Sequence, residues 1–469
     1  MWTKIKIVCT IGPKTCLPKT LLNLKKNGMN LIRLNGSHGT LSWHKKVISR
    51  IRKILPEIPI IFDLPGQKTR VTNIKVEKKI NLGQKIVFTS NQNNKDHKKI
   101  TINNQILHKN IKNKTNVYGD DGNLRLKLLN IKGKDFVCIA KTNGKILPGQ
   151  GINFILKKKN NTLISNNEKK FIQFANKNSV DYIGVSYAKS KKHILTVQKF
   201  IYKKNIRIIS KIEDIDGLNN LEDIIQVSDA IMIDRGDLSI SPEINNVTVA
   251  QKQIIKLCNR YSKPSIVATE LLESMFNRKT PTKSEISDIT NAIYDGCSAT
   301  MLSAETAISN SPEIFVKAMQ NIIHSVTDEK VNNIKDLDSI TISKGISASA
   351  SILCKNLPIN KIVAITKTGY AARILSNSNI SQKIYAITPT IGNARSFNLI
   401  KNTEGIFYKI NFDDKSTDHI IHCLKHLWKL KKIVSSDLIL VVAVGYPKKG
   451  NTMNLIQIHR VFDLISKFK

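Results

Sequence analysis

The residues with the clearest chemical potential are charged side chains that directly follow short apolar segments. Lys211-Ile-Glu213 ends one such segment, and Asp234-Arg-Gly-Asp237 ends the next. Two carboxylates, Glu213 and Asp237, with the remaining positions left to water and substrate oxygens, form the arrangement in which proteins usually hold Mg²⁺. A lysine beside them would supply positive charge to a phosphoryl group in transit, which needs charge neutralisation and alignment more than covalent help. These residues therefore indicate metal-assisted phosphoryl transfer.

Other polar side chains follow apolar segments in the same way, at Arg33-Leu-Asn-Gly-Ser-His38, Asp63-Leu-Pro-Gly-Gln-Lys68, Thr269-Glu270 and Ser303-Ala-Glu-Thr306. Each has a purely structural alternative that the sequence leaves open. A carboxylate or hydroxyl can cap a helix, Arg33 can form a structural ion pair, and Lys211 can lie along the surface. The density of such groups at one kind of position nevertheless favours a functional site.

The segments that precede these groups are short, apolar and β-branched, and they predict eight strands: Lys6–Thr10, Leu31–Leu34, Ile58–Asp63, Tyr182–Val185, Arg207–Lys211, Ala230–Ile233, Ser265–Ala268 and Ala299–Leu302. Amphipathic segments between them predict helices at Lys19–Asn27, Trp43–Leu55, Glu168–Asn178, His193–Lys203, Leu218–Ile225, Val247–Tyr261 and Glu285–Tyr294. This alternation predicts an α/β fold, a (β/α)8 TIM barrel whose strand ends meet at one rim, where barrel enzymes carry their active sites.

Two further regions do not fit the barrel pattern. Residues 71–153 are rich in Val, Ile, Thr, Gly and Asn with frequent turn signals, and predict an inserted small β-barrel domain. The barrel would then comprise residues 1–70 and 154–330. After a polar linker at Val331–Asp338, residues 339–469 predict a C-terminal α/β domain, with strands near Lys361–Thr366, Lys383–Ile387 and Leu438–Val444.

The composition narrows the class of protein. Lys and Arg number 74 against 35 Asp and Glu, a formal net charge of +39. Such a charge attracts nucleic acid, but the basic residues are spread in pairs along helix faces without an aromatic-interleaved stripe, so we expect no nucleic-acid partner. No apolar run is long enough to span a membrane. The seven cysteines form no C-x-x-C pair, which is typical of isolated thiols in a reducing cytoplasm.

Several runs in one order resemble the signatures of pyruvate kinase: Lys6-Ile-Val-Cys-Thr-Ile-Gly-Pro-Lys14, Arg33-Leu-Asn-Gly-Ser-His-Gly39, Lys211-Ile-Glu213, Arg235-Gly-Asp-Leu238, Ala268-Thr269, Leu272-Glu-Ser-Met275 and Met301-Leu-Ser-Ala-Glu-Thr-Ala307. The resemblance covers essentially the whole chain and includes the order of the domains. It implies a glycolytic phosphotransferase, which converts phosphoenolpyruvate and ADP to pyruvate and ATP, with the inserted domain as a lid that excludes water.

The resemblance also implies roles for individual residues. Phosphoenolpyruvate would be contacted by Arg33, Lys211, Gly236, Asp237 and Thr269. Among these, Lys211, Arg33 and Thr269 would be catalytic: Lys211 would stabilise the transferring phosphoryl group and the developing enolate, and Thr269 resembles the residue near the proton path.

Further implied sites hold the metal ions and the nucleotide. Glu213 and Asp237 would bind Mg²⁺ or Mn²⁺. The nucleotide would be bound by Asn35, Gly36, Ser37, His38, Arg70 and Lys169. A monovalent-cation site, K⁺ in the family, would be formed by Asn35, Ser37, Asp63 and Leu64.

The chain departs from the family pattern at positions that bear on activity. Lys68 stands where some relatives carry Glu, and a lysine ammonium can replace a monovalent cation near Asp63, so we expect activity that is largely independent of K⁺. Asp234 replaces a small residue and adds a third carboxylate beside Asp237. Ser239, Ser241 and Glu270 also differ from the usual residues.

The remaining expectations concern regulation and assembly. Thr366-Lys-Thr-Gly-Tyr-Ala371 follows an apolar strand, and a hydroxyl- and glycine-bearing turn that opens a helix could form a phosphate nest. In allosteric relatives the corresponding loop binds a sugar phosphate, so a sugar phosphate or AMP is a candidate effector, and an ordinary turn is the alternative. A homotetramer is expected from the resemblance alone.

Two other functions are alternatives to the phosphotransferase activity that the resemblance implies. A different barrel enzyme that acts on phosphoenolpyruvate or a 2-oxo acid, such as a lyase or mutase, could share the metal site but would need neither the Asn35–His38 run nor the inserted domain. A catalytically weakened scaffold or basic RNA-binding protein would be favoured by loss of Lys211, Glu213 or Asp237, and all three are present.

Overall fold

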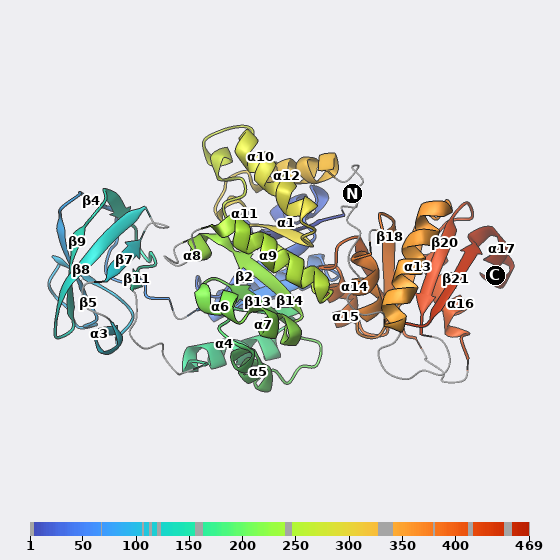
Figure 1. The fold of residues 1–469 in the computed structure, drawn as a ribbon, viewed down its shortest axis with the longest axis horizontal. Coiled ribbons are helices and arrows are strands. Elements are labelled where there is room, and N and C mark those ends of the chain that lie inside the picture. Colours follow the sequence, from blue (N-terminus) through green and yellow to red (C-terminus); the bar gives the residue numbers. More distant parts are fainter. Residues whose placement is uncertain are drawn as a thin grey trace.

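The computed structural model describes residues 4–66, 68–105, 107–111, 115–119, 123–154, 163–239, 246–326, 341–378, 380–410, 416–444 and 453–468. Figure 1 shows three units side by side: a β-rich unit at one end, a barrel in the centre and an α/β unit at the other end. The predicted linker Val331–Asp338 lies outside the described residues.

Eight parallel strands close the central barrel in the order β1-β16-β15-β14-β13-β12-β3-β2. Their bounds are β1 (Lys6–Thr10), β2 (Leu31–Asn35), β3 (Ile60–Asp63), β12 (Tyr182–Val185), β13 (Arg207–Ile212), β14 (Ala230–Asp234), β15 (Ser265–Ala268) and β16 (Ala299–Leu302). Every predicted barrel strand is present, and the predicted TIM barrel is confirmed.

Helices lie around the barrel between successive strands: α1 (Pro18–Lys26), α2 (Leu41–Ile54), α4 (Asn166–Lys177), α5 (Lys191–Lys199), α6 (Ile215–Asn219), α7 (Leu221–Val227), α8 (Arg235–Ser239), α9 (Val247–Arg260), α10 (Lys283–Tyr294), α11 (Ala304–Ala307) and α12 (Pro312–Val326). A 3₁₀ turn spans Glu273–Phe276. The predicted helix Leu218–Ile225 is instead split between α6 and α7. The split occurs because Asn220 leaves the helical conformation, and its amide group donates to the carbonyls of Lys189 and Asp216.

The strand sequences explain the barrel because they can be buried on both faces. One face packs on the helices and the other fills the barrel interior with residues such as Val8, Ile61 and Met232. Leu399, which comes from the C-terminal unit, belongs to the same interior cluster and is fully buried. Strands enclosed in this way read as continuous apolar runs, which is the pattern in the sequence.

The inserted unit follows β3 and has its own core, which includes Phe88, Leu126 and Phe136. Its elements are β4 (Lys78–Ile80), β5 (Lys85–Thr89), β6 (Lys99–Thr101), α3 (Leu107–Asn110), β7 (Asn116–Gly119), β8 (Leu124–Lys132), β9 (Asp135–Ala140), β10 (Gly144–Ile146) and β11 (Asn153–Phe154). Within the described part of this insert, the strands form a six-stranded sheet, β11-β7-β8-β9-β5-β6, and a two-stranded sheet, β10-β4.

The C-terminal unit is a five-stranded sheet of order β19-β18-β17-β20-β21 with helices on both faces. It contains α13 (Ile342–Asn356), β17 (Lys361–Ile365), α14 (Tyr370–Ser376), β18 (Lys383–Thr388), α15 (Ile391–Phe397), β19 (Thr403–Phe407), α16 (His419–Lys429), β20 (Leu438–Ala443), β21 (Leu455–Arg460) and α17 (Val461–Phe468). Strands β19 and β21, at the two edges, were not predicted.

Contacts to the C-terminal unit come from the amino-terminal ends of the barrel strands. Lys6 at the start of β1 donates to the carbonyl of Thr403 (2.6 Å), and the hydroxyl of Tyr182 at the start of β12 donates to the carbonyl of Ser396 (2.7 Å). Arg207 at the start of β13 donates to the carbonyl of Thr368 (3.2 Å). The carboxyl-terminal rim is therefore at the opposite end of the barrel from this interface.

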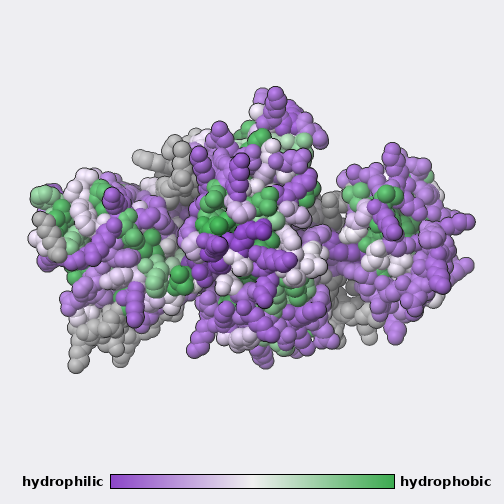
Figure 2. All heavy atoms as spheres, turned by 180° about the vertical axis from the view of Figure 1, so that it is seen from behind, coloured by the Kyte–Doolittle hydropathy of each residue, from purple (hydrophilic) through white to green (hydrophobic). Residues whose placement is uncertain are grey.

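The surface is predominantly hydrophilic over all three units, and hydrophobic residues form only small patches on the face that Figure 2 shows. All seven cysteines are buried and none forms a disulfide. Among the described residues, none of the helices has the length and apolar character that membrane crossing requires.

A buried carboxylate ties the barrel to the C-terminal unit, and we expect its removal to destabilise the protein. Asp181 is fully buried, pairs with Arg52 and Arg395 (2.7 Å), and accepts the backbone N–H of Ile60 (2.8 Å). Asp181→Ala should lower stability by about 3 kcal/mol, because it leaves buried cations without their partner. The midpoint of urea unfolding measures the change. As a control, Asp295→Ala removes the exposed pair with Lys252 and should cost about 1 kcal/mol or less; equal costs would contradict the expectation.

Candidate functional site

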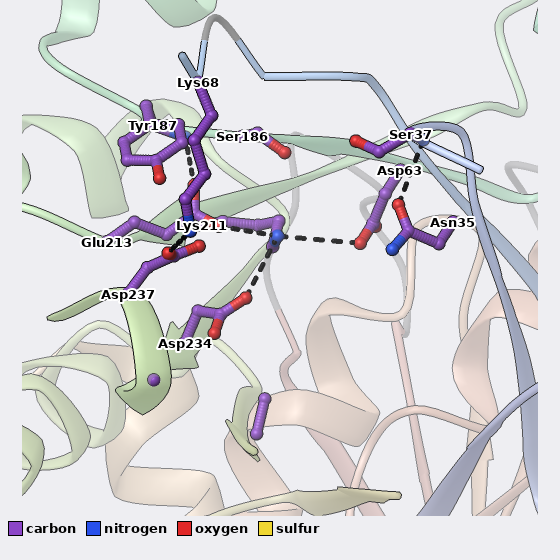
Figure 3. A network of polar contacts seen from close by, with 12 residues as sticks. Asn35, Ser37, Asp63, Lys68, Ser186, Tyr187, Lys211, Glu213, Asp234 and Asp237 are labelled. Atoms are coloured by element: carbon purple, nitrogen blue, oxygen red, sulfur yellow. Dashed lines mark hydrogen bonds and ion pairs between the residues drawn. The ribbon is translucent and has the colours of Figure 1, made fainter. Parts of the chain in front are cut away.

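Lys211, which lies at the end of β13, is the central cation of the rim. The residue is 4% exposed, and its Nζ lies 2.7 Å from Glu213 Oε1, 3.1 Å from Asp234 Oδ2 and 3.7 Å from Asp63 Oδ2. Figure 3 shows these carboxylates converging on the ammonium from three strands. Burial alone would lower the pKa of Lys211, but the three negative charges outweigh burial and raise the pKa. The ammonium therefore stays charged at neutral pH.

Glu213, Asp234 and Asp237 form a cluster of carboxylates beside this lysine. One oxygen of each lies within 4.8 Å of the others. Burial raises the pKa of Glu213 to about 8. The negative charges of Asp234 and Asp237 add to this shift, and the positive charge of Lys211 opposes it. Three oxygen donors at this spacing suit a hard divalent cation, whose charge would offset the mutual repulsion of the carboxylates. The residues thus fit the Mg²⁺ or Mn²⁺ that the sequence predicts.

Arg33 and Asp63 form a second buried pair on neighbouring strands. Asp63 Oδ2 accepts Arg33 Nε at 2.9 Å and lies 2.8 Å from Arg33 Nη2. Arg33 is 7% exposed and Asp63 1% exposed. The structural ion pair that the sequence left open for Arg33 is therefore present, and it places the guanidinium at the same rim as Lys211.

Lys68 does not lie where the sequence interpretation placed it. Its ammonium pairs with Asp237 on the β14 side of the cleft. The reason is electrostatic: Asp63 is already neutralised by the two nitrogens of Arg33, whereas Asp237 has no such partner in the carboxylate cluster. The Lys68 ammonium, which was expected beside Asp63, therefore neutralises Asp237, a candidate metal ligand.

Residues that follow two of the barrel strands adopt left-handed backbone conformations. Thr269 and Glu270, after β15, have φ values of 68° and 53°, and Tyr187, after β12, has φ 50°. Such conformations are costly for residues with side chains and cluster at functional sites. Arg235 holds the first of these turns, because its guanidinium donates to the carbonyls of Thr269 (2.6 Å) and Glu270 (2.8 Å).

The predicted substrate-binding residues of β14 and β15 are in direct contact. The backbone N–H of Gly236 donates to Thr269 Oγ1 at 2.8 Å, and the same hydroxyl donates to the carbonyl of Ala268. Asp237 follows Gly236 in the first turn of α8. Gly236, Asp237 and Thr269 thus share the rim with Lys211 and Arg33.

Most of the predicted nucleotide residues gather after β2. The backbone N–H of Gly36 donates to the carbonyl of Asp63 (3.0 Å), and a Cβ at this glycine would lie 2.3 Å from that oxygen, so only glycine fits. Burial, followed by the charges of Arg70 and Arg33, lowers the pKa of His38. Lys169 is separate: its ammonium lies 5.4 Å from the ring centroid of Phe200, at the end of α5.

The residues of the predicted monovalent-cation site also lie together. Asn35 is in register with Asp63, and its Oδ1 accepts the N–H of Ser37 (3.1 Å). The carbonyl of Leu64 accepts the hydroxyl of Ser186 (2.9 Å). The Oδ1 atom of Asp63 is buried without a hydrogen-bond partner among the described residues. An unpartnered buried carboxylate oxygen is compatible with a cation ligand.

Sequence reasoning missed residues that support the site rather than react in it. Tyr187 binds Glu213 through its backbone N–H, and burial, followed by the nearby carboxylates, raises the pKa of its phenol. Arg235 belongs to the Arg235-Gly-Asp-Leu238 run, but its hydrogen bonds to the turn after β15 can be seen only in the folded structure. No local pattern distinguishes Tyr187 from other tyrosines.

The carboxylate cluster generates a binding prediction. Glu213→Gln and Asp237→Asn should each weaken Mn²⁺ binding by at least about tenfold, because each removes one anionic oxygen ligand. Isothermal titration with MnCl₂ in the absence of substrates measures the affinity. Glu222→Gln, a change on α7 where the carboxylate instead accepts from Tyr261, should leave it unchanged. Wild-type affinity in both site variants would exclude the cluster as the metal site.

Comparison with known proteins agrees with the geometry. The family model "Pyruvate kinase, barrel domain" matches residues 2–316, and "Pyruvate kinase, alpha/beta domain" matches residues 344–459. Pyruvate kinases of Staphylococcus saprophyticus and Staphylococcus haemolyticus are 32% and 33% identical to this chain, over 99% of this chain and 81% of each relative. The pyruvate kinase of Staphylococcus aureus strain MRSA252 is 31% identical over the same shares. The chain belongs to the pyruvate kinase family.

Proposed function

We propose that this chain transfers the phosphoryl group of phosphoenolpyruvate to ADP and releases pyruvate and ATP, at the rim formed by β2, β3, β13, β14 and β15. The observation that carries the proposal is the buried Lys211 ammonium, which sits between Glu213 and Asp234 with the Arg33–Asp63 pair beside it. Two cations next to a carboxylate cluster suit a reaction in which negative charge moves between oxygens.

Each residue would have a distinct part in the reaction. Lys211 and Arg33 would bind the phosphoryl oxygens, and Lys211 would also stabilise the enolate oxygen that forms when the P–O bond breaks. The N–H of Gly236 and the hydroxyl of Thr269 would orient the substrate. A divalent cation held by Glu213 and Asp237 would neutralise further charge on the phosphoryl group. Thr269 would lie next to the position where a proton must reach carbon to convert enolpyruvate to pyruvate.

The nucleotide would approach from the β2 side of the rim. Asn35, Gly36, Ser37 and His38 would bind it together with Arg70, which lies at the start of the inserted domain and donates to the carbonyl of Gly149 (3.1 Å). Closure of that domain would bring Arg70 over the cleft and exclude water. Lys169 would have to leave the Phe200 ring to join this set.

Regulation and assembly are also proposals. The turn Thr366–Ala371 has a left-handed Gly369 (φ 80°), but the N–H of Gly369 is occupied by Thr366 Oγ1 (3.0 Å). A sugar phosphate or AMP would therefore bind through the other groups of the turn. The homotetramer and the cytoplasmic location follow from the family, and they stay predictions.

Removal of the Lys211 ammonium should slow the chemical step and leave substrate binding nearly unchanged. Lys211→Met keeps the side-chain bulk, and we expect kcat to fall by roughly 10²–10³-fold while KM for phosphoenolpyruvate changes by less than about threefold. A coupled assay of pyruvate formation measures both constants. Lys252→Met, a change in a surface ion pair, serves as the control. A Lys211→Met variant with unchanged kcat would remove the proposed role.

The potassium requirement is predicted to be small. Lys68 brings a positive charge into the cleft but pairs with Asp237 and not with Asp63, so this prediction requires that the added charge in the cleft, and not occupation of the site beside Asp63, replaces the monovalent cation. Turnover in Tris buffer should be about the same with KCl as with tetramethylammonium chloride at equal ionic strength. A many-fold loss of activity without K⁺ would contradict this prediction.

A further inference from the structure

Asp234 is a buried carboxylate that the proposed reaction does not yet use. It ends β14, is 7% exposed, and its Oδ2 lies 3.1 Å from the ammonium of Lys211. Asp234 therefore reaches Lys211 from a neighbouring strand. Glu213, in contrast, lies two residues after Lys211 in the same segment of the chain. Figure 3 shows Asp234 and Glu213 on separate sides of the ammonium.

Both carboxylate oxygens of Glu213 already accept hydrogen bonds. Its Oε1 accepts from Lys211 (2.7 Å) and its Oε2 accepts from the backbone N–H of Tyr187. A divalent cation bound by Glu213 and Asp237 must share one of these oxygens. The same cation repels the Lys211 ammonium at short range in a site that water screens poorly. Metal binding would thus weaken the Lys211–Glu213 contact.

Other carboxylates cannot replace that contact. Asp63 is 3.7 Å from Lys211 Nζ, and the oxygen in question is already bonded to Arg33. Asp237 pairs with Lys68 and is the more exposed ligand, with 19% of its side chain accessible against 9% for Asp234. Apart from Glu213 itself, Asp234 is the only carboxylate among the described residues that lies close to Lys211 without a second arginine or lysine within ion-pair distance.

We propose that Asp234 is a positioning residue: it anchors the Lys211 ammonium from the β14 side, so that Glu213 can serve a divalent cation while Lys211 stays in place. The inference rests on the proposed function, in which Lys211 contacts the transferring phosphoryl group. Burial would raise the pKa of Asp234, but the charges of Lys211, Arg33 and Lys68 outweigh burial and hold the pKa below its usual value. The anchor is therefore anionic at neutral pH.

The competing role for Asp234 is that of a third metal ligand, since its carboxylate lies within 4.8 Å of those of Glu213 and Asp237. The two roles differ in one observable. A ligand contributes to metal affinity even without substrates, whereas an anchor of Lys211 affects turnover and leaves metal affinity nearly unchanged.

The experiment compares Asp234→Ala and Asp234→Asn with wild type. For each protein, kcat and KM for phosphoenolpyruvate are measured at saturating Mn²⁺, and Mn²⁺ affinity is measured by titration without substrates. Asp234→Ala should lower kcat by about tenfold or more, with KM and Mn²⁺ affinity within about threefold of wild type. Asp234→Asn should recover part of the loss, because an amide oxygen still accepts from the ammonium.

Asp437→Ala is the matched control. Asp437 is equally buried, at 7% exposure, and pairs with Lys361 (2.5 Å) in the C-terminal unit, so its removal should leave all three constants unchanged. The asparagine variant keeps the side-chain volume and reports on the anchor if the alanine variant fails to fold.

Three results would overturn the inference: an unchanged kcat in both variants, an asparagine variant as slow as the alanine variant, or a tenfold loss of Mn²⁺ affinity, which would make Asp234 a ligand. An inactive wild-type chain would instead overturn the proposed function. The two failures are thereby distinguished.

Discussion

A lysine ammonium that is almost sealed from water is the constraint on which the site depends. Removal of a charge from water is expensive, and it is tolerated only when oppositely charged groups replace the hydration. Lys211 therefore requires Glu213 and Asp234 close by, and the carboxylates in turn require cations. In this part of the rim, Lys68, Lys211 and Arg33 face the carboxylates of Asp63, Glu213, Asp234 and Asp237. Burial, together with the charges of Asp234 and Asp237, raises the pKa of Glu213 to about 8. A divalent cation bound there would offset the repulsion among the carboxylates and would attract an anionic substrate.

The barrel makes this arrangement possible because each partner comes from a different strand. Glu213 directly follows β13, Asp234 ends β14 and Asp63 ends β3, so no single segment can position the cluster. The C-terminal unit is bound at the other end of the barrel, through Lys6 of β1, Tyr182 of β12 and Arg207 of β13. Strand β13 thus carries Arg207 at the interface and Lys211 at the rim, separated by a short, rigid segment.

The sequence predicted the barrel strands well, because strands buried on both faces are continuous apolar runs between helices and their polar ends are easy to see. Edge strands were harder: β19 contains Glu404 and Gly405, and β21 alternates polar and apolar residues, so neither has that pattern. The helix break at Asn220 depends on carbonyls that only the fold brings near.

At the site, most of the residues singled out from the sequence lie at one rim, but the sequence did not predict how their charges pair. Lys68 follows β3 and was expected beside Asp63, yet Arg33 already neutralises Asp63 and the lysine pairs across the cleft with Asp237. Likewise, Lys169 lies on a helix whose start is near the rim, but its long side chain reaches the Phe200 ring instead. Long flexible side chains choose partners by the three-dimensional charge distribution, which spacing along the chain does not encode.

The central claim is that the cluster around Lys211 directs a phosphoryl group to a nucleotide and not to water. The most direct measurement is ³¹P NMR of the wild-type chain with phosphoenolpyruvate and ADP as MgCl₂ is added. The account predicts that the phosphoenolpyruvate resonance is replaced by the γ-phosphate resonance of ATP, with Mg²⁺ required. Loss of phosphoenolpyruvate to inorganic phosphate, or no reaction at any Mg²⁺ concentration, would contradict it.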